Sequence, residues 1–183
     1  MTPAQIAALK ADIAANADMH TQPMNGAGHA AIIALYNAAS TTDVWRTDAP
    51  VNAIMDAINW SAFTPVEPAD GTALYTNRLL LIQTKQINLQ SMLQGRTTVD
   101  ASKANLRAGL RDAVTTLPAG ASGASISAAG ASGVNVLNAL VRKATRFEKL
   151  FAIFPAVTGS VTANLLVLEG SLSTSDLEIA RES

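Results

Sequence analysis

The chain has 183 residues, which is the size of one ordinary domain. It contains no cysteine and two histidines, which excludes disulfides, thiol catalysis and iron–sulfur clusters and leaves little material for a transition-metal site. Charged residues make up 15% and the net charge is −1, which argues against a generally basic nucleic-acid-binding protein. The sequence has no apolar run long enough to span a membrane and no start of a secretory leader, so we expect a soluble intracellular protein.

The few charges are unevenly distributed along the chain. Residues 1–70 carry a net charge of −5, residues 71–150 carry +7, and residues 151–183 carry −3. This acidic–basic–acidic order predicts self-complementary packing, either within the monomer or between neighbours in a ring. The alternative is that the segregation disappears once the chain has folded. The low total charge is explained most simply if other subunits cover much of the surface.

Apolar residues at helical spacing predict three helices in the first third of the chain. The first begins at a capping box, with Thr2 as N-cap, and ends near Asn16. A loop separates it from the second helix, which covers about residues 27–38. A short extended piece follows, and Pro50 then opens the third helix. Apolar residues of that helix and just after it are expected to face the core, namely Val51, Ile54, Met55, Ile58, Trp60 and Phe63.

Three further helices are predicted over residues 72–94, 101–116 and 134–151. Gly95 occupies the position where a helix-ending residue with positive φ is favoured, and Asp100 is the expected cap of the next helix. Residues 119–133 consist of alanine, glycine and serine with one isoleucine, and they predict a flexible loop. Residues 160–169 predict a strand or hairpin, and Ser173 a cap for a short terminal helix.

These elements predict a mainly α fold, a helical bundle of about five helices with a small β element and an extended C-terminal arm. Residues 1–155 would form the helical domain, which contains the loop over residues 119–133. Residues 156–183 would form the β and extended arm, which we expect to become ordered on assembly because it departs from helical patterning.

The sequence contains no convincing catalytic, cofactor-binding or metal-binding pattern, so we expect no enzyme activity and no cofactor. Gly26-x-Gly28-x-x-Ala31 precedes a helix, but a dinucleotide site also requires a hydrophobic strand directly before it. We therefore interpret this pattern as a glycine-rich helix entry. His20 and His29 flank a loop without the spacing of a metal pair, and both are expected at the surface.

Basic residues carry more information, because they recur at helical spacing. Lys103, Arg107 and Arg111 follow one another at every fourth position, which predicts one exposed stripe beside an apolar seam. Such residues would either line a channel for DNA, meet an acidic partner, or simply form a solvated face. The candidate DNA-facing or partner-facing residues are Arg78, Lys85, Lys103, Arg107, Arg111, Arg142, Lys143, Arg146 and Lys149.

The predicted helix over residues 72–94 also carries a long uncharged polar stretch. Such a face suits hydrogen bonding between subunits, and it equally suits plain solvent. The residues concerned are Gln83, Thr84, Gln86, Asn88, Gln90 and Ser91.

Two stretches of the sequence resemble small structural proteins of tailed bacteriophages. The first is Val44-Trp45-Arg46-Thr47-Asp48-Ala49-Pro50 followed by Ile58-Asn59-Trp60. The second runs from Asn77-Arg78 through Gln94-Gly95-Arg96-Thr97-Thr98 to Asn105-Leu106-Arg107-Ala108-Gly109-Leu110. The resemblance covers residues 1–117 and the helix predicted after the low-complexity loop. Within that group, a helical chain with an extended C-terminal segment looks most like a head-to-tail adaptor.

The resemblance implies a virion protein that is made in the host cytoplasm and has no enzyme activity. Adaptors of this kind form a homo-oligomeric ring, commonly of twelve copies, which joins the portal protein to a tail or nozzle protein. The ring surrounds the DNA exit channel, where non-specific contact with DNA is expected. The strand formed by Leu165, Leu166, Val167 and Leu168 would add to the sheet edge of a partner.

Two other interpretations remain open. The first is a capsid cement or decoration protein, or another structural protein of the neck or tail. The second, from a different class, is a helical domain that binds a small molecule and would require polar groups converging in a pocket.

Overall fold

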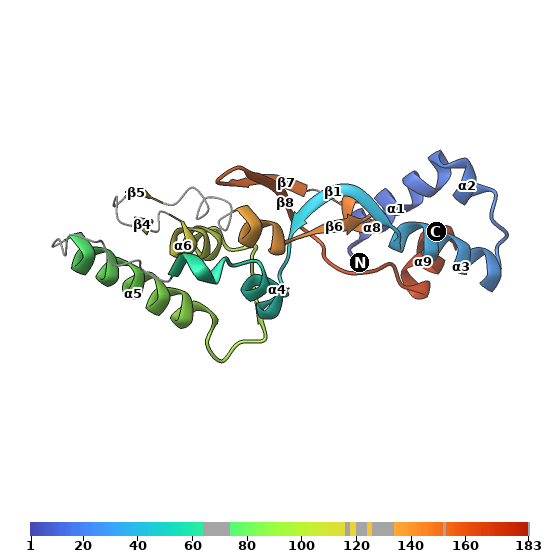
Figure 1. The fold of residues 1–183 in the computed structure, drawn as a ribbon. Coiled ribbons are helices and arrows are strands. Elements are labelled where there is room, and N and C mark those ends of the chain that lie inside the picture. The colour runs from blue at the N-terminus through green and yellow to red at the C-terminus, as the bar shows by residue number, and fades with distance from the viewer. Residues whose placement is uncertain (64–73, 116–117, 120–123, 126–133, 152, 183) are drawn as a thin grey trace. The chain divides into compact units, whose positions relative to one another are not determined.

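A computed structural model describes residues 1–63, 74–115, 118–119, 124–125, 134–151 and 153–182 of the chain. The chain folds into two compact units, each assembled from separate stretches of sequence. Unit 1 comprises Met1–Val44, Lys143–Pro155 and Asn164–Ser183, and unit 2 comprises Trp45–Arg142 and Ala156–Ala163. Figure 1 shows the helices and strands of both.

The fold is α/β, so the prediction of a mainly helical bundle was wrong. A four-stranded sheet has the order β6-β1-β8-β7. Its strands are β1 (Ala39–Trp45), β6 (Val141–Thr145), β7 (Ile153–Thr158) and β8 (Val161–Leu166). The β1 and β8 strands run parallel, with Val44 opposite Asn164.

The other strand pairings make this sheet mixed. The N–H of Arg46 donates to the Leu140 carbonyl, and that of Arg146 donates to the Ala38 carbonyl, so β6 and β1 run in opposite directions. The β7 and β8 strands follow each other through a tight turn, in which Gly159 has a φ of +60°.

The sheet was underestimated chiefly because residues 134–151 were predicted as one helix. They instead form a helix over residues 134–139, then β6, and then α8 (Arg146–Leu150). A capping box starts α8, since the Thr145 hydroxyl accepts the N–H of Glu148 and the Glu148 carboxylate accepts the N–H of Thr145. This start signal lies inside an apolar pattern that is continuous enough to resemble a single helix.

Unit 1 packs helices around an apolar core. The helices are α1 (Pro3–Ala15), α2 (Ala17–His20), α3 (Gly26–Asn37), α8 and α9 (Thr174–Glu182). The capping box predicted at Thr2 is confirmed, because the Gln5 N–H donates to its hydroxyl and its own N–H donates to the Gln5 side chain. The core residues are Leu9, Ile13, Met19, Ile32, Tyr36, Phe147, Phe151, Leu172, Leu177 and Ala180.

The C-terminal residues belong to this core, which corrects the predicted extended arm. Leu177 and Ala180 on α9 are fully buried, and α9 packs against α1 and α3. The short terminal helix was nevertheless predicted correctly, and the Ser173 hydroxyl accepts the N–H of Asp176 at its start.

Unit 2 contains two helices that pack against each other, α5 (Leu74–Leu93) and α6 (Ala104–Val114), together with α4 (Val51–Asp56). A 3-10 turn, η1 (Trp60–Phe63), follows α4. Two short strand pairs complete the unit: β2 (Ala49–Pro50) with β3 (Thr98–Val99), and β4 (Pro118–Ala119) with β5 (Ala124–Ser125).

The predicted boundaries of α5 and α6 were only partly correct. Gly95 follows α5 with a φ of +72°, as its position predicted. The start of α6 is three residues later than predicted, because the Asp100 carboxylate accepts the N–H of Ser102 and shapes a turn before the helix. Most of the predicted flexible loop over residues 119–133 lies outside the described residues.

None of the helices in the described part of the chain is both long and apolar enough to cross a bilayer.

Replacing Leu177 by alanine is expected to lower the free energy of unfolding by about 2–5 kcal/mol, because it leaves a cavity in the core of unit 1. The matched control is Ile179→Ala on the same helix, whose side chain is 52% exposed. This control should change the free energy by less than about 0.5 kcal/mol. Urea unfolding followed by circular dichroism measures both variants, and two equally small effects would contradict a core position for α9.

Candidate functional site

Arg107 is buried within unit 2 and does not face solvent, which corrects the predicted exposed stripe. Its side chain is 2% exposed, and its guanidinium lies 4.6 Å from the centre of the Trp45 ring. Its Nη1 donates to the carbonyls of Ala101 (2.7 Å) and Ser102 (2.8 Å), and its Nε donates to the Thr158 hydroxyl (2.9 Å). Burial lowers the pKa of Arg107 from its usual value. The position is structural because the five N–H donors of a guanidinium can satisfy several converging acceptors.

Several other predicted basic residues are also held by groups of their own unit. Lys85 is buried on α5, where its ammonium donates to the Asp112 carbonyl and lies 3.7 Å from the Asp112 carboxylate. The other ion pairs join Lys103 to Asp100 (3.7 Å), Lys143 to Asp43 (2.9 Å) and Arg146 to Asp12 (3.7 Å).

The remaining candidates differ in their surroundings. Arg111 and Lys149 are exposed. Arg142 is half-buried and is not a free cation, because its side chain or backbone contacts another group of the protein. The backbone of Arg78 belongs to α5, and its side chain lies outside the described part of the structure.

The predicted partner-binding strand lies inside the protein's own sheet. Leu165 and Leu166 are half-buried on β8, which has β1 on one side and β7 on the other. Leu168 packs against the core of unit 1, and Val167 is exposed. The backbone of β8 therefore already has strand neighbours on both sides.

The glycine pattern and the histidines are structural features of unit 1. The Asn25 side chain caps α3 by accepting the Gly28 N–H, and a Cβ at Gly28 would clash with the Pro23 carbonyl oxygen. The glycine is therefore required by a close backbone approach, as a helix entry predicts. His29 is buried and lies 3.7 Å from the Glu178 carboxylate, so its predicted surface position was wrong, whereas His20 is exposed.

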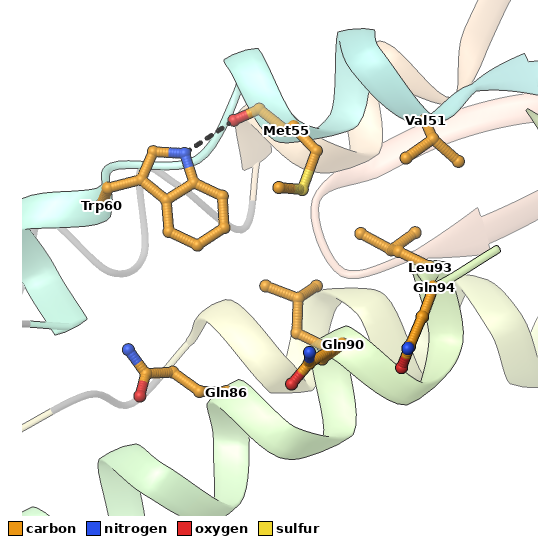
Figure 2. A pocket seen from close by; sticks show the side chains of 8 residues that line it. Val51, Met55, Trp60, Gln86, Gln90, Leu93 and Gln94 are labelled. Carbon is orange, nitrogen blue, oxygen red and sulfur yellow. Dashed lines mark hydrogen bonds between the residues drawn. The ribbon is translucent and has the colours of Figure 1, made fainter. Parts of the chain in front are cut away.

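A groove of about 480 Å³ in unit 2 is lined mainly by apolar side chains. Figure 2 shows α4 and η1 on one side of it, contributing Val51, Met55 and Trp60, and α5 on the other. The indole N–H of Trp60 donates to the Met55 carbonyl (3.0 Å), which orients the ring along the groove wall. We call this the α4–α5 groove; its α5 residues are Gln86, Leu89, Gln90, Leu93 and Gln94.

The pairing of β2 with β3 brings the two walls of this groove together. The β2 and β3 strands pair antiparallel, with Ala49 opposite Val99. The Val51 N–H then donates to the Thr97 carbonyl, which places the start of α4 beside the segment that follows α5. Because Gly95 reverses the chain after α5, the first turn of α4 faces the last turn of α5.

The outer side of α5 exposes large apolar side chains, and from Leu79 onward its exposed residues carry no charge. Leu80 is 56% exposed and Ile87 is 61% exposed. From Leu79 to Leu93 the one charged residue is Lys85, and its side chain is buried. Exposed positions at spacings of four and three residues form one stripe, which we call the α5 ridge: Leu80, Thr84, Ile87 and Ser91.

Two groove residues were assigned to the core by sequence reasoning and are instead partly open to solvent. Trp60 is 44% exposed and Met55 is 37% exposed. Their apolar character and helical spacing are the same as those of core residues. The uncharged stretch of α5 was the signal that could be read from sequence, and it marks the opposite wall of the same groove.

The comparisons identify no relative of this chain: no protein-family model, no curated protein and no solved structure matches it. Within the described residues, no three histidine or acidic side chains gather in a way that could hold a metal ion.

Replacing Arg107 by alanine is expected to lower the free energy of unfolding by about 2–4 kcal/mol, since buried carbonyls lose their donor and the Trp45 ring loses a packed cation. The control is Lys103→Ala on the same predicted stripe, whose exposed ion pair should contribute less than about 1 kcal/mol. Thermal and urea unfolding measure both changes. If both variants are as stable as the unchanged protein, the structural role of Arg107 is wrong.

Proposed function

We propose that this chain is a structural subunit of a tailed-phage virion, in which it forms a head-to-tail adaptor ring between the portal and the tail. The resemblance of residues 44–60 and 77–110 to phage structural proteins supports this class of function. The observation that carries the proposal is the outer surface of α5, where Leu80 and Ile87 are exposed and the one charged residue between Leu79 and Leu93, Lys85, is buried.

Such a surface is typical of protein association. Single exposed apolar residues are common on monomers, but here they lie on the helix that also forms a groove with half-exposed Trp60 and Met55. The central parts of protein interfaces are enriched in aromatic residues and methionine and depleted of charge. The α4–α5 groove has this composition, with Trp60, Met55 and no charged lining residue, and the α5 ridge shares the lack of charge.

The positions of the basic residues favour protein contacts over DNA contacts as the main role of unit 2. Arg107 and Lys85 are buried, and Lys103 is paired with Asp100. Among the predicted residues whose side chains the structure describes, Arg111 of unit 2 and Lys149 of unit 1 are exposed and would make the non-specific phosphate contacts expected around a DNA channel.

A second candidate function is binding of a small apolar molecule in the α4–α5 groove. Its volume of about 480 Å³ falls within the range of ligand pockets, about 300–1,000 Å³. Its glutamine side chains would supply a few polar contacts to such a ligand, as specific pockets do.

Negative-stain electron microscopy of the purified chain, with and without the portal protein of the same phage, tests the proposal. A ring with a central hole that attaches to the portal is expected. Attachment to the capsid shell without the portal would instead indicate a cement or decoration protein. A persistent monomer whose melting temperature rises with a small apolar ligand would favour the second candidate function.

The oligomer is expected to resist high salt, because the proposed contact surface carries no charge. Its molar mass, measured by light scattering, should be unchanged or larger when NaCl is raised from about 0.05 M to about 1 M. Over that range the screening length falls to about 3 Å, which removes attraction between exposed charges. Dissociation at high salt would indicate that acidic and basic segments hold the subunits together, contrary to an apolar contact.

A further inference from the structure

We propose that the occupant of the α4–α5 groove is the α5 ridge of a second copy of this chain, in a head-to-tail contact. This inference deepens the proposed function and rests on it, since a ring requires such a contact. It names the two surfaces that meet and predicts that each subunit uses both at once.

The ridge and the groove match in chemistry. Leu80 and Ile87 of the ridge are aliphatic, and Met55, Leu89 and Leu93 of the groove would surround them. The hydroxyls of Thr84 and Ser91 alternate with the aliphatic residues along the ridge. They face no charge in the groove, where the polar groups are glutamine amides that both donate and accept hydrogen bonds.

The absence of charge on either surface favours a second copy as the occupant. A basic or acidic partner would have to desolvate its charges against uncharged walls, with nothing to pair them. A copy of this chain brings aliphatic side chains and hydroxyls, which need only apolar contact and neutral hydrogen bonds. The α5 ridge of one copy therefore has the chemical character that the α4–α5 groove of another copy can bind.

The dimensions agree as well. Leu80 and Ile87 are seven residues apart, which is about 10.5 Å along a helix. The groove residues on α5 extend from Gln86 to Gln94, a span of about 12 Å at the same rise. Two aliphatic side chains at the ridge spacing therefore fit within the length of one groove.

The directions of the two surfaces give a head-to-tail contact. At about 100° per residue, the centre of the ridge lies about 120° around the axis of α5 from the centre of the groove's α5 wall, and Gln90 and Gln94 form the border between the two surfaces. A subunit whose groove is filled by one neighbour therefore keeps its own ridge for another neighbour. Repetition of this contact closes into a ring when the rotation between subunits divides a full turn.

A ring also compensates for the modest size of the contact. The ridge from Leu80 to Ser91 is about 16 Å long, and at a width of about 10 Å it covers on the order of 160 Å², less than the roughly 800 Å² per partner of a standard interface. The α4 wall adds to this area. In a closed ring each subunit is held by two such contacts, and both must break before it leaves.

Two substitutions separate the surfaces experimentally. Ile87→Glu places a charge on the ridge and leaves the groove unchanged, whereas Met55→Glu places a charge in the groove and leaves the ridge unchanged. Each variant alone is expected to be monomeric, with association at least ~100-fold weaker, because a carboxylate would be desolvated without a partner. An equimolar mixture is expected to form dimers and nothing larger, because it contains one intact ridge-and-groove contact. Since this dimer lacks the second contact that each subunit has in a ring, it is expected at higher protein concentration than the ring of the unchanged protein, and the masses are therefore measured over a concentration series.

The matched control is Ile179→Glu, which makes the same chemical change at an isoleucine of comparable exposure on α9. It should keep the molar mass of the unchanged protein. Light scattering after size exclusion measures the masses, and circular dichroism and melting temperature verify that all three variants are folded, as their exposed positions predict.

The inference is overturned if the unchanged protein stops at a dimer, if Ile87→Glu or Met55→Glu retains its full mass, or if the mixture stays monomeric. Its failure differs from failure of the proposed function. Oligomers that depend on the ridge and groove but do not attach to the portal would contradict the adaptor role alone. Attachment to the portal that is unaffected by Ile87→Glu would contradict the ridge-and-groove contact alone.

Discussion

The buried guanidinium of Arg107 is the interaction on which the architecture of unit 2 depends. It joins the Trp45 ring, the turn at Ala101 and Ser102, and Thr158 of β7, which are distant in sequence. Because Arg107 belongs to α6, these contacts fix that helix, and the Lys85–Asp112 pair then attaches α5 to it. The side of α5 that carries Lys85 therefore packs against α6 inside unit 2. The rest of the helix surface forms the ridge and one wall of the groove.

This use of cations explains why the charge pattern along the chain does not reappear as a basic surface. In unit 1, Lys143 and Arg146 from the basic segment pair with Asp43 and Asp12 from the acidic one. The Asp12 carboxylate also accepts the Tyr36 hydroxyl (2.6 Å), and burial together with this carboxylate raises the pKa of Tyr36. The sequence pattern left open whether complementary charges meet within the monomer or between subunits. These contacts support the first alternative for unit 1.

Local signals allowed much of the helical part to be predicted from sequence, and competing signals caused the errors. Thr2 and Gly95 mark helix ends through backbone chemistry that needs no tertiary partner, so the ends of α1 and α5 were predicted closely. Thr145 carries an equally local start signal, but the apolar periodicity around it concealed β6. Arg107 was wrongly predicted to be exposed. Helical spacing indicates on which face of a helix a side chain lies, but it does not indicate that backbone carbonyls and an aromatic ring surround that side chain and bury it.

The candidate site also has one feature that depends on a single helix and one that depends on contacts between distant parts of the sequence. The lack of charge on α5 is readable from sequence, because it belongs to one helix. The groove was not predictable, because its other wall depends on the pairing of β2 with β3, nearly fifty residues apart in sequence, and Met55 and Trp60 have the character of core residues. An uncharged helix face could equally be solvated. Trp60 and Met55 in the opposite wall of the groove favour association over solvation. A contact that buries them against Leu80 and Ile87 of a second copy removes from water two apolar surfaces that a monomer leaves exposed.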